Sequence, residues 1–343
     1  MQSPGRPGAA DSFLLLLLAS ATAAAFFPLL LAIPWSLSDS DPATYASAVL
    51  VMLAVQCVFL NAGVKSEPDA KGAAAALPVY LASAALLAFS PQSPQGQASA
   101  LHPGLLSLAL FFAATVLPIF GWSGARRLRF TVAYAFLAWP ALATPAILAE
   151  PALVSLTAGF TQAVTAVLGL AVSRSPGNVF TSLTGEVPLI IAPQCAALTA
   201  LIGFIAFMLP LAYFFKGSVR SKAGWLACGA LGVIALNFAR IAAVVLAWYY
   251  WGVGPAASLF QLLNGNAVFN AAIAVGLGLA LVFGLRLPRL RGASFIMEGP
   301  AQAIRDAIPE IEDAAPAYAS RLAFLLLAVL AFAFISVKFV AWQ

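Results

Sequence analysis

The stretch that decides the fold runs from Gly185 to Phe215 and reads GEVPLIIAPQCAALTALIGFIAFMLPLAYFF. It begins with a short β-like run, passes a proline and a glutamine, and continues as a long apolar segment. Pro193 is typical of the first position of a helix, where its missing N–H leaves no hydrogen bond unmade. We therefore expect a helix that starts near Pro193 and carries Cys195 in its first turn.

Cys195 has two interpretations. At a helix N-terminus, unpaired backbone N–H groups and the positive end of the helix dipole stabilise an anion. Such a position would lower the pKa of the Cys195 thiol and favour the reactive thiolate. An isolated cysteine in an apolar run is more often a small packing residue. The other residues of the chain are needed to choose between these two interpretations of Cys195, a nucleophile and a packing residue.

The composition is that of a membrane protein. Of the 343 residues, 62% are hydrophobic and only 8% are charged, whereas soluble domains carry about 25% charged residues. We therefore predict an all-α polytopic integral membrane protein. No basic run is interleaved with aromatic residues, which argues against nucleic-acid binding.

The cysteine and histidine content excludes several classes of site. The chain holds three cysteines and one histidine, too few for a disulfide framework, a zinc site or Ser/His/Asp catalysis. Cys57 and Cys228 lie in apolar runs and are interpreted as packing residues, and His102 lies in a loop beside Pro103. We expect neither a metal nor a cofactor.

Nine segments approach the length of a membrane span, which needs roughly 20 apolar residues. They are Phe13–Ile33, Thr44–Val64, Ala73–Phe89, Gly104–Trp122, Phe130–Leu148, Cys195–Phe215, Gly224–Trp251, Leu259–Leu285 and Leu322–Val340. We therefore expect eight or nine spans.

The loop charges set the orientation, because basic residues favour the cytoplasmic side of the membrane. Basic clusters lie at residues 65–71, 126–129, 216–222 and 286–291, and the alternate loops are acidic or uncharged apart from Arg174. If the N-terminus lies inside, all the basic clusters fall on the cytoplasmic side only if Ala152–Val172 does not cross the membrane. That stretch contains three Thr, a Ser and a Gln, which is typical of a re-entrant or interfacial helix.

Polar residues inside the predicted spans indicate where function resides, because they are costly in a bilayer. Asn237 and Arg240 are three residues apart and share a helix face. Arg240 lies about 24 Å along its helix from Gly224, in the outer part of the bilayer. Gln261 and Asn264 lie in the first turns of the next predicted span. The alternatives are that Arg240 snorkels to lipid headgroups and that the amides form ordinary interhelical hydrogen bonds.

The predicted topology brings Cys195, Asn237 with Arg240, and Gln261 with Asn264 to the same outer depth. A thiol, a cation that lowers its pKa, and amide donors near an oxyanion are the components of a cysteine acyl-transfer site. Arg240 would stabilise the thiolate, the oxyanion or both. A histidine that could protonate the leaving amine is absent from this set.

Two segments resemble the exosortase/archaeosortase family of membrane cysteine transpeptidases. They are PQCAALTALIGF around Cys195 and LNFARIAAVVLAWYYWG around Arg240. The resemblance covers about Ser173 to Gly284, and the multi-span N-terminal half is compatible with it. It implies that Cys195 is the nucleophile and that Arg240 is essential.

The chain departs from the family pattern in two places. A third family position is His in bacterial members and Arg in archaeal ones, but no His or Arg occurs between Arg240 and Arg286. Aligning the small family residue one turn later with Gly265 places Gln261 at this position, with Asn264 as the other candidate. The motif cysteine is often followed by Ser and Gly, where this chain has Ala196–Ala197. The chain therefore resembles a divergent member.

The site predicted in this way has three catalytic members and three supporting ones. Cys195, Arg240 and Gln261 are the catalytic candidates. Asn237, Asn264 and Gln194 are the candidates for substrate binding or support.

The resemblance also implies a substrate and a location. The substrate would be a secreted protein with a C-terminal tail made of a short motif such as Pro-Glu-Pro, a transmembrane helix and a basic cluster. Cleavage would occur at the outer face of a bacterial inner membrane, followed by transfer to an envelope acceptor, alongside exopolysaccharide or other envelope machinery. The alternatives are a transporter or lipid- or anion-binding protein that needs Arg240 but not Cys195, and a non-catalytic relative that binds tails.

We predict three parts of the chain. Residues 1–150 form an N-terminal bundle of about five spans. Residues 151–291 form an exosortase-like catalytic core with a re-entrant or interfacial helix, an extracytoplasmic extended segment and three spans. That extended segment covers Ser173–Pro193 and contains the β-like run VPLII, which we expect to form a hairpin with Asn178–Ser182. Residues 292–343 form an amphipathic cytoplasmic segment over Ala301–Ile311 and a last span.

Overall fold

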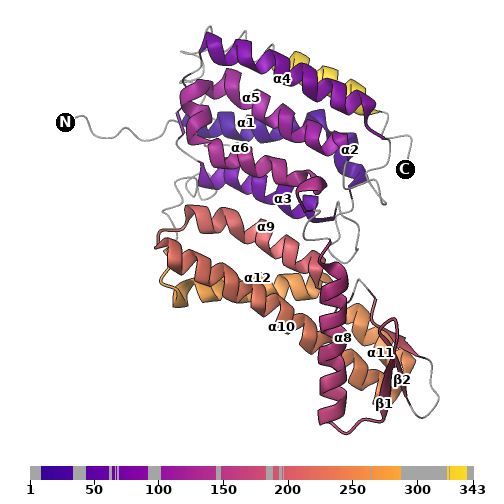
Figure 1. The fold of residues 1–343 in the computed structure, drawn as a ribbon. Coiled ribbons are helices and arrows are strands. Elements are labelled where there is room, and N and C mark those ends of the chain that lie inside the picture. The colour runs from indigo at the N-terminus through magenta and orange to yellow at the C-terminus, as the bar shows by residue number, and fades with distance from the viewer. Residues whose placement is uncertain are drawn as a thin grey trace. The chain divides into compact units, whose positions relative to one another are not determined.

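The protein is mainly helical, with one small β-sheet (Figure 1). The computed structural model describes residues 9–33, 44–61, 64–65, 67, 69–91, 102–143, 148–182, 188–192, 195, 197–263, 265–286, 323 and 325–337. The chain divides into two compact units. Unit 1 comprises Met1–Pro34, Ala46–Leu142 and Leu287–Gln343, and unit 2 comprises Trp35–Tyr45 and Ala143–Arg286. The three-part division into residues 1–150, 151–291 and 292–343 stays a prediction.

Unit 1 contains the helices that precede the functional region. They are α1 (Ala9–Ala25), α2 (Phe27–Ala32), α3 (Thr44–Val55), α4 (Ala70–Phe89), α5 (Pro103–Arg127) and α6 (Arg129–Ala135), with a π-helical turn at Gln56–Leu60 after α3. A further apolar helix covers Leu325–Ser336. The amphipathic segment predicted at Ala301–Ile311 lies outside the described residues.

Helices α4 and α5 are joined by small polar side chains at their interface. The Ser83 hydroxyl donates to the Ser107 carbonyl oxygen at 2.7 Å, and the Ser107 hydroxyl donates to the Ser83 carbonyl oxygen at 2.7 Å. The hydroxyls of Tyr80 and Thr115 lie 2.8 Å apart. Small hydroxyl residues let two helices approach closely and satisfy each other in an apolar environment, so this pair is well suited to a membrane.

The segment Phe130–Leu148 is not a continuous helix in the structure. Helix α6 ends at Ala135, and short 3₁₀ turns follow at Phe136–Ala138 and Pro140–Ala143. Trp139 is extended, with ψ 115°. Proline lacks a backbone N–H and disfavours the helical conformation of the residue before it, which explains the break. The break was not predicted, and a span over this segment stays a prediction.

Three described helices are long and apolar enough to cross a membrane: Ala70–Phe89, Pro103–Arg127 and Val219–Trp251. The bent pair Val253–Leu262 and Ala267–Val282 adds a fourth if it counts as one span. Shorter apolar helices include Phe13–Ala25, Ala46–Val58 and Ala200–Phe214. The chain is thus a helical membrane protein, and the figure of eight or nine spans stays a prediction.

Unit 2 holds the predicted functional residues. Its elements are α8 (Glu150–Val167), β1 (Val172–Ser175), β2 (Val179–Ser182), β3 (Leu189–Ile190), α9 (Leu198–Phe214), α10 (Val219–Trp251), α11 (Val253–Leu262) and α12 (Gly265–Val282). The strands form an antiparallel sheet in the order β1-β2-β3. An extended element before Cys195, as the sequence predicts, is therefore present.

The turn between β1 and β2 depends on two residues with positive φ. Gly177 has φ 81° and Asn178 has φ 59°, and glycine and asparagine are the residues that adopt this conformation at least cost. The Arg174 guanidinium donates to the Asn178 side-chain oxygen and braces the turn. The predicted hairpin of VPLII with Asn178–Ser182 corresponds to the β2–β3 pair, in which Val179 pairs with Ile190 and Phe180 with Leu189, whereas the pairing with β1 was not predicted.

Helix α8 occupies most of the predicted re-entrant or interfacial segment. It is absent from the described helices that are both long and apolar enough to span a membrane. Its threonines bond within the helix: the Thr157 hydroxyl donates to the Leu153 carbonyl oxygen at 2.8 Å, and the Thr161 hydroxyl donates to the Thr157 carbonyl oxygen at 2.9 Å. The helix can therefore bury these residues without an outside partner.

Helices α9, α10 and α12 pack closely around Phe204, which is fully buried. A Cβ atom added at Gly229 of α10 would lie 2.3 Å from the Phe204 ring, and one added at Gly276 of α12 would lie 3.0 Å from it. The Trp225 indole N–H donates to the Gly276 carbonyl oxygen at 2.6 Å. Small residues at helix contacts are the usual means of association in membranes.

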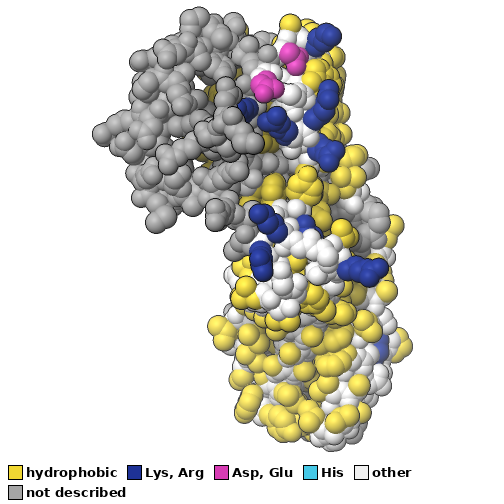
Figure 2. All heavy atoms as spheres, turned by 90° about the vertical axis from the view of Figure 1, so that its left-hand side faces the viewer, with side chains coloured by type: hydrophobic (Ala, Val, Ile, Leu, Met, Phe, Trp, Pro, Cys, Tyr) yellow, Lys and Arg dark blue, Asp and Glu magenta, His cyan; other side chains and the backbone are white. Residues whose placement is uncertain are grey.

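Two of the predicted basic loops meet at one end of this helix group. The backbone N–H of Lys216 donates to the Arg286 carbonyl oxygen at 2.9 Å, and the reverse bond measures 3.0 Å. Arg220 and Lys222 follow in the first turn of α10. Figure 2 shows groups of Lys and Arg side chains on one face, and hydrophobic side chains are exposed over much of the remaining coloured surface. Cys195 lies before the opposite end of α9.

Candidate functional site

Cys195 precedes helix α9 instead of lying in its first turn. The helix begins at Leu198, and its N-cap residue Ala197 is left-handed, with φ 59° and ψ 2°. This residue separates Cys195 from the helical backbone, so the expected placement of Cys195 in the first helical turn is wrong. Pro193, Gln194 and Ala196 lie outside the described residues.

The backbone of Cys195 is held from two directions. The Asn237 side-chain amide of α10 donates to the Cys195 carbonyl oxygen at 2.6 Å. The Cys195 backbone N–H donates to the Ala192 carbonyl oxygen at 2.8 Å. Asn237 is only 1% exposed and Cys195 is 8% exposed, so water does not compete for the amide bond. Asn237, predicted as a supporting residue, contacts the cysteine directly.

Arg240 lies nearly one turn beyond Asn237 and is 6% exposed. Its guanidinium carbon is 4.4 Å from the centre of the Phe260 ring of α11. Its Nε atom is buried and has no hydrogen-bond partner among the described residues. A cation over an aromatic face is attracted by the negative charge density of the ring. The side chain therefore packs inside the unit, which disagrees with the snorkelling alternative.

The electrostatics of Cys195 differ from the sequence-based expectation. Burial raises the pKa of the Cys195 thiol, while a backbone hydrogen bond with Ala192 and the charge of Arg240 lower it by less. Because the thiol is outside the first helical turn and shielded from water, desolvation outweighs the favourable charge. The predicted lowering of the pKa is therefore wrong. Attack by this thiol therefore requires a group that accepts its proton.

Cys195 and Gln261 line one cavity of about 530 Å³. Its walls come from Pro188–Ala192, from α10 and from α11, and they are mainly apolar. Gln261 is exposed within unit 2, so its amide can meet a ligand there. The structure thus brings together the thiol and the predicted third position, whereas Asn264 lies outside the described residues.

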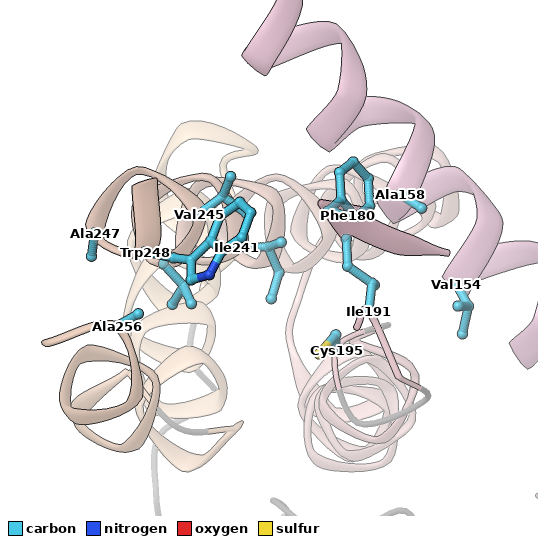
Figure 3. Packing of buried hydrophobic residues seen from close by; sticks show 11 residues of the cluster. Val154, Ala158, Phe180, Ile191, Cys195, Ile241, Val245, Ala247, Trp248 and Ala256 are labelled. Atoms are coloured by element: carbon cyan, nitrogen blue, oxygen red, sulfur yellow. The ribbon is translucent and has the colours of Figure 1, made fainter. Parts of the chain in front are cut away.

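An apolar cluster surrounds the cysteine. Figure 3 shows Cys195 beside Ile191, with Val154 and Ala158 of α8 on one side and Trp248 of α10 on the other. These apolar side chains lower the polarity around the thiol and strengthen charge interactions with it.

Two features of the site were missed by the sequence reasoning. The predicted span Leu259–Leu285 is interrupted: α11 ends at Leu262, α12 begins at Gly265, and the two are bent by 45°. Gln261 therefore belongs to a separate short helix. Phe260, which covers Arg240, was also not predicted, although its place directly before Gln261 was a usable signal. No group of three His, Cys, Asp or Glu that could hold a metal occurs among the described residues.

Comparison with known proteins gives one family match. No curated protein and no solved structure matches the chain. The model of the transmembrane exosortase family (Exosortase_EpsH) matches residues 35–278. This region is more than half of the chain and includes α8, the sheet, Cys195, α10 and α11. Members of the family are in general membrane cysteine transpeptidases that act on protein sorting tails. The chain therefore belongs to the transmembrane exosortase family.

Proposed function

We propose that the protein is a cysteine protease/transpeptidase that cleaves the C-terminal sorting tails of secreted proteins and transfers the proteins to an envelope acceptor. The observation that carries this proposal is the hydrogen bond from Asn237 to the Cys195 carbonyl oxygen. This bond fixes Cys195 at a cavity shared with Gln261. A packing cysteine needs neither a dedicated amide donor nor an adjoining cavity.

The reaction would proceed by acyl transfer. The Cys195 sulfur attacks the carbonyl carbon of the scissile bond, the tail leaves as an amine, and a thioester forms. An acceptor amine then attacks the thioester and regenerates the thiol. The charge of Arg240 would stabilise the oxyanion that forms on the attacked carbonyl oxygen.

The proton steps would differ from those of relatives with a histidine. An amide has no titratable group near neutral pH, so Gln261 can orient the peptide or a water molecule but cannot act as a general base. The thiol proton would pass to the leaving amine directly or through water. This assignment gives Gln261 a positioning role at the third family position.

The distribution of charge supports an outward-facing site in a bacterial inner membrane. Arg220 and Lys222 lie in the first turn of α10, and Arg240 lies 21 residues beyond Val219, the first residue of the helix. At 1.5 Å per residue, Arg240 is about 32 Å away from that basic end, and a bilayer core is about 30 Å thick. If the basic end faces the cytoplasm, the site opens to the outside.

Processing of a tagged protein that ends in a Pro-Glu-Pro tail, co-expressed with this protein, tests the proposal. The wild type should shorten the tagged protein, and Cys195→Ala should not. The Cys228→Ala variant is the matched control and should process normally. No shortening by the wild type across several candidate tails would contradict the proposal.

A second function is favoured by the raised pKa of Cys195 and by the missing histidine: the protein would bind tails without cleaving them. Co-purification of an uncleaved tail with the wild type would support it. In that case Gln261→His should introduce cleavage if only the base is missing. Dependence on Arg240 without any dependence on Cys195 would instead indicate a transporter or an anion-binding protein.

A further inference from the structure

Among the residues that the structure describes, strand β3 is at the edge of the sheet. The strand order is β1-β2-β3, so β3 is paired with β2 on one side and has no described strand on its other side. Phe180 pairs with Leu189, and the Ile191 N–H donates to the Asn178 carbonyl oxygen at 3.1 Å. Successive backbone groups of a strand point to opposite sides. The N–H and C=O groups of Ile190 therefore point away from β2, toward the open edge.

The cavity at Cys195 runs along this open edge. Five consecutive residues, Pro188 to Ala192, line it. Two of these residues, Leu189 and Ile190, form β3. Their side chains point to opposite faces of the strand, and both residues line the cavity, as expected for a cavity beside the strand edge. Helices α10 and α11 supply the other walls, including Val244 and Phe260.

We propose that the substrate peptide binds in this cavity as an extended strand that pairs with the main chain of Ile190 along the free edge of β3. The proposal rests on the cysteine transpeptidase function above and describes how that site takes its substrate. The side chains of the peptide contact the apolar walls from α10 and α11. Added strands of this kind obtain affinity from main-chain bonds and selectivity from side-chain pockets.

The chemistry of the edge selects a peptide over a lipid. Ile190 is 58% exposed, so a bound partner can reach its backbone N–H and C=O groups, and a partner that fills the cavity displaces their water and has to replace those hydrogen bonds. An acyl chain would leave both groups of Ile190 unpaired. A peptide in the extended conformation supplies one acceptor and one donor at the required spacing.

The path of the chain then leads to the nucleophile. The carbonyl of Ala192 accepts the Cys195 N–H at 2.8 Å, and both residues line the cavity, so a peptide that runs beside β3 continues past the thiol. The added-strand geometry predicts which residues of the peptide tolerate proline. The peptide residue that pairs with Ile190 must keep its N–H, whereas its two neighbours, whose N–H groups point away from β3, need not.

Substitution of Ile190 tests the main-chain contact in the co-expression assay. Ile190→Pro removes the outward N–H and leaves the bonds to β2 in place, and edge strands accept proline for this reason. Ile190→Ala is the matched control, since it removes the side chain but keeps the N–H. We expect the rate of tail processing to fall about tenfold in Ile190→Pro, because one hydrogen bond is lost and the peptide carbonyl that would accept it stays unpaired. In Ile190→Ala the rate should fall less than about threefold. Equal rates for the two variants would overturn the proposal.

Cross-linking tests the binding mode without catalysis. Ala257 is exposed and lines the cavity wall opposite β3. The variant Ala257→Cys also carries Cys195→Ala and Cys228→Ala. It is mixed with a set of tails, each of which has one cysteine at a different position, and disulfide formation is induced by an oxidant. Disulfide formation at every second tail position is expected. Cross-links at a spacing of three to four residues, as for a bound helix, would refute the added strand, as would a lack of cross-links to a tail that the wild type processes.

The two experiments separate the present proposal from the function on which it rests. Alternating cross-links to a tail that the wild type leaves uncleaved would support the binding mode and refute the transpeptidase. Cleavage by the wild type with equal activity of Ile190→Pro and Ile190→Ala would support the transpeptidase and refute the binding mode.

Discussion

The hydrogen bond between Asn237 and Cys195 gives the sharpest prediction. In Asn237→Ala the donor is lost, and the Cys195 carbonyl oxygen stays buried without its 2.6 Å partner. Because Asn237 is 1% exposed, water has little access to replace the amide. The backbone that carries the thiol should therefore move away from its present position beside the cavity.

The size of the effect follows from the cost of an unpaired carbonyl. A buried acceptor without a donor costs about 1–3 kcal/mol, whereas hydrogen bonds between membrane helices average about 0.6 kcal/mol. A cost near 1.4 kcal/mol, within the first range, corresponds to about a tenfold change in rate. We therefore expect Asn237→Ala to lower the rate of tail processing about tenfold, with little change in the amount of protein in the membrane.

The assay compares the initial rate of tail processing in the wild type, Asn237→Ala and Asn270→Ala. Asn270 lies on α12 with an exposed side chain, so its variant makes the same chemical change away from the cysteine. The labelling rate of Cys195 by a small thiol reagent, measured in a Cys228→Ala background, reports on the position of the thiol independently. Wild-type processing by Asn237→Ala, or an equal loss in Asn270→Ala, would refute the positioning role.

Three further predictions concern charge, strain and packing. Arg240→Gln removes the charge that lowers the pKa of Cys195, so that pKa should rise further and the pH profile of thiol labelling should move to higher pH; an unchanged profile would show that the charge does not act on the thiol. Ala197→Gly should raise the free energy of unfolding by about 0.5–1 kcal/mol, because a left-handed alanine is strained and glycine is not; thermal unfolding in detergent measures this, and a lower midpoint would contradict it. Gly229→Ala should destabilise the protein by about 1–3 kcal/mol through overpacking, whereas Gly232→Ala, whose added Cβ meets nothing within 4 Å, should be neutral or slightly stabilising in the same measurement.

Local signals predicted the elements that depend on nearby residues only. Hydrophobic content indicated a helical membrane protein because the cost of exposing polar backbone in lipid leaves few alternatives. The Gly, Pro and Ser residues of Ser173–Pro193 and the β-like run VPLII indicated the extended element and its hairpin. Pro140 was an available signal for the break after α6, but the length of the apolar run outweighed it in the prediction.

The candidate site was predictable in its membership and not in its geometry. The polar residues Asn237 and Arg240 were expected in the outer part of one helix face. In the structure Asn237 contacts a carbonyl oxygen and Arg240 contacts the Phe260 ring. These neighbours depend on contacts between α10 and segments that are distant in the sequence. Periodicity carries no information about such contacts.

The sequence by itself determined the class of protein, the hairpin before the cysteine and the family, because each of these follows from composition or from short motifs. Only the tertiary structure decided the state of Cys195. Desolvation depends on every atom around the thiol, including α8, β2 and α10, and the dipole of a helix acts only over its first turn. With α9 starting at Leu198, the thiol lies outside that turn, and burial raises its pKa more than the charge of Arg240 lowers it.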